Sequence, residues 1–138
     1  MAYRIEKTED LIEVHLSGQV DEWEILAILG KLRDMAPRKE TSDVWLLGEE
    51  CVVRWDAFSM IVDGIKRLLP PDLIPSRSAI VVASPFQMAQ AEMYRQEAKS
   101  LPYETGAFMT REEAVRWLRS KDVQSSAPAS EVSPGLAT

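Results

Sequence analysis

Residues 78–98 read SAIVVASPFQMAQAEMYRQEA and decide the fold of the chain. The run from Ala79 to Ala83 is apolar and rich in β-branched residues, which favours a strand that is covered on both faces. Ser84 is a preferred helix N-cap, Pro85 suits the first helical position, and Gln87 stands where a capping box places its second member. The stretch therefore predicts a buried strand followed directly by a helix.

The same alternation of strand and helix recurs along the chain, because apolar runs alternate with segments that have apolar residues at helical spacing. The expected strands are Tyr3–Glu6, Leu11–Leu16, Val44–Leu47, Ala79–Ala83 and Tyr103–Met109. The expected helices run from Asp21 to about Met35, from Trp55 to Leu69, over Pro85–Lys99, and onward from a capping box at Thr110–Glu113. The polar residues up to Asp43 are assigned to a loop. The order ββαβαβαβα predicts an α/β fold with a mixed sheet of about five strands, a parallel centre and about four helices.

Length and composition favour one folded domain. The chain has 138 residues, of which 46% are hydrophobic and 28% are charged, as in ordinary globular proteins. The composition shifts to Ser, Ala and Pro after residue 120. We therefore expect a domain over residues 1–120 and a disordered tail over residues 121–138.

Charge and cysteine content exclude several kinds of function. The net charge is −6 and no basic run is present, so we expect no nucleic-acid binding. Neither a signal-like N-terminus nor an apolar run of about 18 residues is visible, so we expect no membrane span. Cys51 is the single cysteine, which rules out an internal disulfide and suits a reducing compartment. A cytoplasmic protein is the expectation.

The sequence offers few groups for catalysis or metal binding. Cys51 and His15 are the one possible nucleophile and base, and no third group that would orient the base is apparent. One Cys and one His make a zinc site only if two carboxylates converge on them from elsewhere. No Gly-rich phosphate loop is present. We expect no catalytic residues, no metal and no cofactor.

Ser84 allows two interpretations. The free N–H groups of a helix N-terminus at the carboxyl edge of parallel strands can bind an anion, which makes Ser84 a candidate anion site. A plain N-cap, already explained by Pro85 and Gln87, is the favoured interpretation.

The central helix carries more apolar surface than packing on a sheet requires. One stripe contains Phe86, Ala89 and Met93, and another contains Ala91, Tyr94 and Ala98. The surplus stripe either fills a broad core or forms a surface for a partner or ligand. The candidate surface comprises apolar and aromatic residues from the second and third helices: Trp55, Met60, Phe86, Ala89, Met93 and Tyr94.

Four stretches resemble the SpoIIAA-like branch of the STAS superfamily, and the resemblance covers about Tyr3 to Leu118. They are Leu16–Val20, Ala79–Ser84, Met93–Tyr94 and Phe108–Leu118. The resemblance implies a small intracellular bacterial protein with a STAS-type α/β sheet, from a family whose members are mostly uncharacterised. Some STAS-like folds also resemble the CRAL-TRIO lipid carriers, which implies an apolar ligand space beside the sheet.

One feature of the STAS family is missing from this sequence. In anti-sigma-factor antagonists, the loop after the third strand carries a phosphorylatable Ser in a motif of the Asp-Ser-Ser-Gly type. Residues 48–59 read GEECVVRWDAFS and lack that motif. Ser59 is the nearest hydroxyl, but it lies inside the predicted helix, and the neighbouring Glu49, Glu50 and Asp56 would repel a phosphate. We therefore expect no phosphoswitch.

Three functions follow from the sequence. The first is a non-enzymatic STAS-like binding or regulatory module that acts through protein–protein contact or self-association, by the surplus stripe of the central helix together with Met60 and Trp55. The second is a carrier or sensor of an apolar small molecule or lipid, in a cavity lined by Phe86, Met93, Met60 and Trp55. The third, and least favoured, is an enzyme that uses Cys51 and His15.

Overall fold

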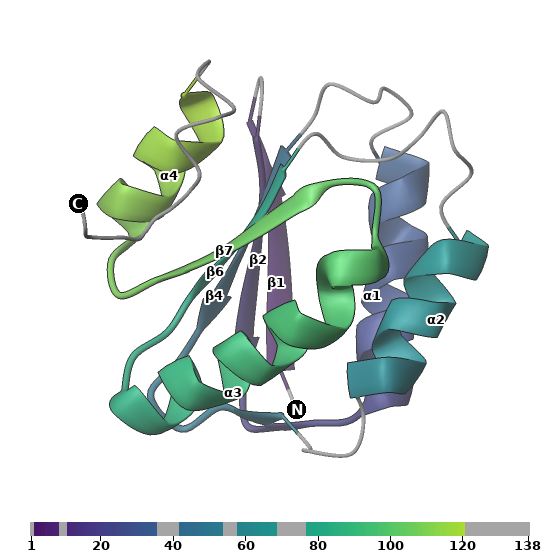
Figure 1. Cartoon of the computed structure of the whole chain (residues 1–138), viewed down its shortest axis with the longest axis horizontal. Helices are drawn as coiled ribbons and strands as arrows, with labels where there is room; N and C mark the ends of the chain where they lie inside the picture. The colour runs from purple at the N-terminus through teal and green to yellow at the C-terminus, as the bar shows by residue number, and fades with distance from the viewer. Residues whose placement is uncertain (1, 9–10, 36–41, 54–57, 69–76, 121–138) are drawn as a thin grey trace.

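A five-stranded mixed sheet forms the centre of the molecule (Figure 1). The computed structural model describes residues 2–8, 11–35, 42–53, 58–68 and 77–120. The strands of this sheet are β1 (Ala2–Lys7), β2 (Leu11–Ser17), β4 (Ser42–Leu47), β6 (Arg77–Val81) and β7 (Glu104–Phe108). Their order is β1-β2-β4-β6-β7, with β1 antiparallel to β2 and the other neighbours parallel. The predicted mixed sheet with a parallel centre is confirmed.

Helices cover both faces of this sheet (Figure 1). They are α1 (Glu22–Met35), α2 (Phe58–Leu68), α3 (Pro85–Glu97), continued by the short 3-10 helix η3 (Ala98–Ser100), and α4 (Arg111–Arg119). Figure 1 shows α1, α2 and α3 on one side of the sheet and α4 on the other. Helix α4 contacts β4, β6 and β7. None of the described helices is both long and apolar enough to cross a bilayer.

Each face of the sheet has its own apolar cluster, because successive side chains of a strand point to opposite faces. On the side of α1, α2 and α3, β2 contributes Ile12, Val14 and Leu16 to the larger cluster. On the side of α4, Val44 and Ala79 pack with Leu118. Both faces of the sheet are thus buried over its parallel centre.

Three predicted helix starts have the expected capping contacts. The backbone N–H of Glu24 donates to Asp21 Oδ1 over 2.9 Å, and the N–H of Asp21 donates to Glu24 Oε1 over 3.0 Å. Ser84 Oγ accepts from the N–H of Gln87 over 3.1 Å, and Thr110 Oγ1 caps α4 in the same way. The capping signals in the sequence therefore placed these helix starts correctly.

The structure differs from the sequence interpretation in three places. Strand β6 runs from Arg77 to Val81 rather than from Ala79 to Ala83, and the N–H of Ala83 donates to the side chain of Gln87 in the next helix instead of to a strand. Strand β4 begins at Ser42 rather than Val44, so Asp43 belongs to the strand and not to the loop before it. Two short segments, β3 (Gln19–Val20) and β5 (Val52–Val53), also form a separate parallel pair that the sequence did not predict. Segments this short carry no periodic signal, because two residues cannot show alternation. The predicted tail, residues 121–138, lies outside the described residues.

The close approach of α4 to β7 requires a glycine. A Cβ on Gly106 would lie 2.8 Å from Cε2 of Phe108 and 3.1 Å from Cζ3 of Trp117. The two rings pack against each other with centroids 5.4 Å apart. A methyl group at position 106 therefore fits only if these rings shift, which would disturb their packing in the cluster under α4.

We predict that Gly106→Ala lowers the free energy of unfolding by about 1 to 3 kcal/mol, because the added methyl overpacks the cluster. Urea denaturation of the wild type and the variant measures the difference. In a Phe108→Leu background the same substitution should cost less, because the ring that blocks the methyl is gone. An equal cost in both backgrounds would contradict this explanation.

Candidate functional site

A chamber of about 100 Å³ lies between the sheet and helices α1, α2 and α3. It is lined mainly by apolar and aromatic side chains, with a few polar groups from the central strands and α3. The lining residues are Leu16, Ile25, Leu29, Asp43, Trp45, Leu47, Val53, Phe58, Ile61, Ile65, Ser78, Ile80, Gln87, Gln90, Ala91, Tyr94 and Tyr103. A concave, mostly apolar space with a few polar groups is the usual form of a small-molecule site.

Asp43 is the single carboxylate among these lining residues. It lies on β4, directly opposite Ser78 of β6 in the parallel register. Ser78 Oγ donates a hydrogen bond to Asp43 Oδ1, and Trp45 Nε1 donates to the same oxygen over 3.0 Å. The second oxygen, Oδ2, takes part in neither bond. No Lys or Arg is among the described residues that line the chamber.

The surroundings of Asp43 shift its acidity. Burial raises the pKa of this carboxyl from 3.8 to about 6, although the hydrogen bonds from Ser78 and Trp45 act in the opposite direction. Burial also raises the pKa of Tyr94 and of Tyr103, and the negative charge of Asp43 contributes to both shifts. Both phenols are therefore neutral. Near neutral pH the ionised Asp43 is the one negative charge among the described residues that line the chamber.

Two glutamine side chains of α3 face the chamber and are almost fully buried, with exposed fractions of 2% for Gln87 and 3% for Gln90. The side chain of Gln87 accepts from the N–H of Ala83 and donates to the carbonyls of Gly48 and Cys51. Nε2 of Gln90 donates to a backbone carbonyl of β5 over 2.9 Å. Its Oε1 is buried and has no hydrogen-bond partner among the described residues. The chamber therefore offers an unused acceptor besides Asp43.

The structure separates the residues of the predicted surface. Tyr94 lines the chamber and packs edge-on against Phe58. Phe86 is 54% exposed, Met60 and Met93 are about 40% exposed, and Ala89 is also exposed. These four do not line the chamber, and Trp55 lies outside the described residues. Of the two stripes on α3, the one with Ala91, Tyr94 and Ala98 is thus the inner stripe, and the other faces outward.

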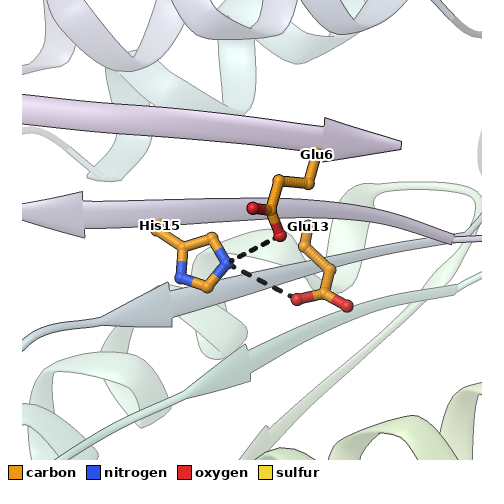
Figure 2. Close-up of side chains that lie close together, drawn as sticks. All are labelled: Glu6, Glu13 and His15. Carbon is orange, nitrogen blue, oxygen red and sulfur yellow. Dashed lines mark ion pairs between the residues drawn. The ribbon is translucent and has the colours of Figure 1, made fainter. Parts of the chain in front are cut away.

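Cys51 and His15 belong to opposite faces of the sheet. Cys51 is buried in the cluster with Val14 and Leu16, and burial raises the pKa of its thiol to about 11. His15 lies between these two residues on β2, so its side chain points to the other face. There it lies beside Glu6 and Glu13 (Figure 2). The geometry does not support the proposed pair of nucleophile and base.

Sequence reasoning missed Asp43, Ser78 and Gln90 as members of one site. The alternation of Asp43 and Trp45 with Ser42 and Val44 was the available signal for an inward-facing Asp43. It was too short to separate a strand from the preceding polar loop. The contact between Asp43 and Ser78 depends on the register of two strands that are 35 residues apart in the chain.

Comparison with known proteins supports the fold. No family model matches the chain, and no curated protein matches its sequence. The structure is similar to the crystal structure of an uncharacterised protein from the DUF3478 family with a SpoIIAA-like fold, from Shewanella loihica PV-4. The TM-score is 0.56 at 17% sequence identity, and the similarity covers 85% of this chain and 92% of that chain. The SpoIIAA-like fold expected from the sequence is thereby confirmed.

We predict that Asp43→Asn stabilises the protein above about pH 7 by about 1 to 3 kcal/mol. The folded-state pKa of Asp43 lies above its unfolded value, so ionisation opposes folding and its cost grows as the pH rises through about 6. An amide keeps the acceptor for Ser78 and Trp45 without the charge. The measurement is the difference in unfolding free energy between the variant and the wild type, at about pH 4 and about pH 7.5. The same change at the exposed Asp63 is the control, and a pH-independent difference for Asp43→Asn would contradict the prediction.

Proposed function

We propose that this SpoIIAA-like domain is a non-enzymatic binding module that takes a small, largely apolar molecule into the chamber between the sheet and α3. The observation that carries the proposal is the buried carboxyl of Asp43 in a chamber where none of the described lining residues is a Lys or Arg. Burying a carboxylate with no positive charge beside it costs free energy even when it accepts hydrogen bonds, as Asp43 does from Ser78 and Trp45, so such a group is more often found at sites of function than in a structural core. A bound donor group would provide the missing partner.

The size of the chamber limits the ligand. An engineered protein cavity of roughly 150 Å³ binds benzene, whereas drug-sized ligands occupy about 300 to 1,000 Å³. A space of about 100 Å³ therefore suits one ring or a short chain. The apolar part of a larger lipid would not be enclosed there, so we propose a small molecule rather than a whole lipid.

The polar groups of the chamber indicate which hydrogen-bonding group the ligand should have. Asp43 Oδ2 and Gln90 Oε1 are both acceptors, so the complementary group is a donor such as an amine or a hydroxyl. Asp43 is mainly ionised above about pH 6, where a protonated amine would also neutralise its charge. We propose a small apolar amine as the preferred class of ligand.

Benzylamine and toluene test this proposal, because they share a ring and differ in the amine. Calorimetric titration should give tighter binding of benzylamine to the wild type, with an affinity that falls as the pH drops below about 6 and Asp43 becomes protonated. Asp43→Asn should weaken benzylamine binding by about tenfold or more and leave toluene binding unchanged. Asp63→Asn, which removes the same charge from an exposed position, should change neither. Equal binding of benzylamine by the wild type and Asp43→Asn would contradict the role of Asp43.

We infer a second candidate function, self-association, from the outward stripe of α3. Phe86, Ala89 and Met93 lie on one exposed face of a helix whose other face is buried. An apolar helix face of this kind can pair with the same face of a second copy in a two-fold symmetric contact. The contact would remove Phe86 and Met93 from water, which is the driving force for association.

We predict that Phe86→Ser lowers the dimer affinity by about tenfold or more, because the side chain is the largest apolar group of the stripe. Sedimentation equilibrium over a range of concentrations measures the affinity. Met109→Ser is the control, since Met109 is 49% exposed and lies outside α3. A wild-type protein that stays monomeric at millimolar concentration would remove self-association as a function.

A further inference from the structure

A cluster of three potential metal ligands lies on the face of the sheet opposite the chamber. Glu6 comes from β1, and Glu13 and His15 come from β2 (Figure 2). One ligand atom from each residue lies within 4.8 Å of the others. Side chains of Glu6 and His15 are 51% and 31% exposed, whereas that of Glu13 is 7% exposed. The cluster is therefore anchored in the protein and reachable from solvent.

The distances around His15 Nε2 suit an ion better than a hydrogen bond. Nε2 lies 3.5 Å from Glu13 Oε1 and 3.7 Å from Glu6 Oε1, which is longer than a normal hydrogen bond. Two ligand atoms on one tetrahedral ion, each bound at 2.0 to 2.1 Å, are about 3.4 Å apart. Nε2 itself is buried and has no hydrogen-bond partner among the described residues. An ion between the three side chains would satisfy this atom.

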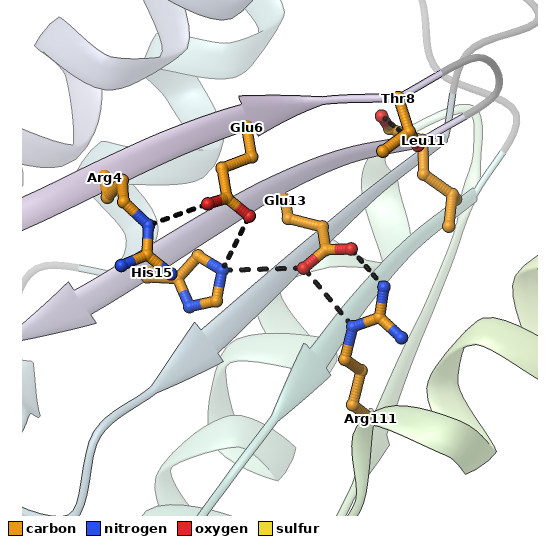
Figure 3. A network of polar contacts seen from close by, with 7 residues as sticks. All are labelled: Arg4, Glu6, Thr8, Leu11, Glu13, His15 and Arg111. Carbon is orange, nitrogen blue, oxygen red and sulfur yellow. Dashed lines mark hydrogen bonds and ion pairs between the residues drawn. The ribbon is translucent and has the colours of Figure 1, made fainter.

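Two arginines hold the carboxylates in place (Figure 3). Arg4 Nε forms an ion pair with Glu6 Oε2 at 3.0 Å, which leaves Oε1 directed toward His15. Arg111 binds both oxygens of Glu13: Nη2 donates to Oε2, and Nε donates to Oε1 over the longer distance of 3.3 Å. Metal-ligating carboxylates usually have such outer partners, which orient the oxygen that binds the ion.

The two acids of the cluster lie close to each other, and each is paired with an arginine. Glu6 and Glu13 are directly opposite each other in the antiparallel register, an arrangement of like charges that destabilises a sheet. Arg4 pairs with Glu6 and Arg111 pairs with Glu13, which offsets part of this repulsion. Glu112 also lies close enough to interact with Arg111. Three carboxylates thus accompany the guanidiniums of Arg4 and Arg111 in this region.

We propose that Glu6, Glu13 and His15 form a binding site for a divalent transition-metal ion, with Zn²⁺ as the probe and water in the remaining position. An imidazole together with carboxylates suits Zn²⁺ better than Mg²⁺ or Ca²⁺, which prefer oxygen ligands alone. The site is separate from the chamber, because the side chains of β2 alternate between the two faces.

Metal titration of the full chain, without an affinity tag and after removal of metals by EDTA, tests the site. Calorimetry with Zn²⁺ should show one ion per chain, and Co²⁺ should give the visible absorption of a site with nitrogen and oxygen ligands. Glu6→Gln and His15→Asn should each weaken Zn²⁺ binding by about tenfold or more.

Glu92→Gln is the matched control for Glu6→Gln. Glu92 is 49% exposed and pairs with Arg95 over 3.0 Å, much as Glu6 is 51% exposed and pairs with Arg4 over 3.0 Å. This variant should bind Zn²⁺ like the wild type. Thermal unfolding verifies that each variant is folded. If His15→Asn does not fold, the comparison of Glu6→Gln with the wild type tests the site. Absence of Zn²⁺ binding, equal affinity in Glu6→Gln and Glu92→Gln, or a thiolate-to-cobalt band from Cys51 would overturn the proposal.

Discussion

The buried amide of Gln87 fixes the position of α3, and the chamber depends on that position. Its side chain links the start of α3 to the N–H of Ala83 and to the carbonyls of Gly48 and Cys51. A buried amide with satisfied hydrogen bonds is costly to displace, because moving the helix would leave several polar groups without partners. Farther along the inner face, Gln90 and Ala91 provide little apolar volume. The space beside β4 and β6 therefore remains open instead of being filled by large side chains.

The two faces of the sheet differ in polarity. The side covered by α1, α2 and α3 is mainly apolar, and its chamber includes the polar side chains of Asp43, Ser78, Gln87 and Gln90. The other side is divided between the apolar contact of α4 and a charged region over β1 and β2. Arg111 connects these two regions, since it begins α4 and binds Glu13 of β2. Charged groups at this junction are acceptable because they are paired and partly hydrated.

Both proposed sites arise from alternation along single strands. On β2, Val14 and Leu16 point into the core, so Glu13 and His15 point together toward the opposite face. On β4, the same rule places Asp43 beside the chamber. Alternation shows which residues of one strand share a face, but it does not show which strands are neighbours. The sequence interpretation consequently treated His15 as a possible base for Cys51, without the two carboxylates that surround it.

The sequence by itself determined the order of the helices and of the strands of the main sheet, three of the helix starts, and the presence of a surplus apolar stripe on α3. These features are local, since capping and periodicity act over a few neighbouring residues. Tertiary structure decided which stripe of α3 faces inward, and it brought Asp43 to Ser78 and Glu6 to Glu13 and His15. The register between strands and the packing of α3 make these contacts, and both depend on residues that are distant in the chain.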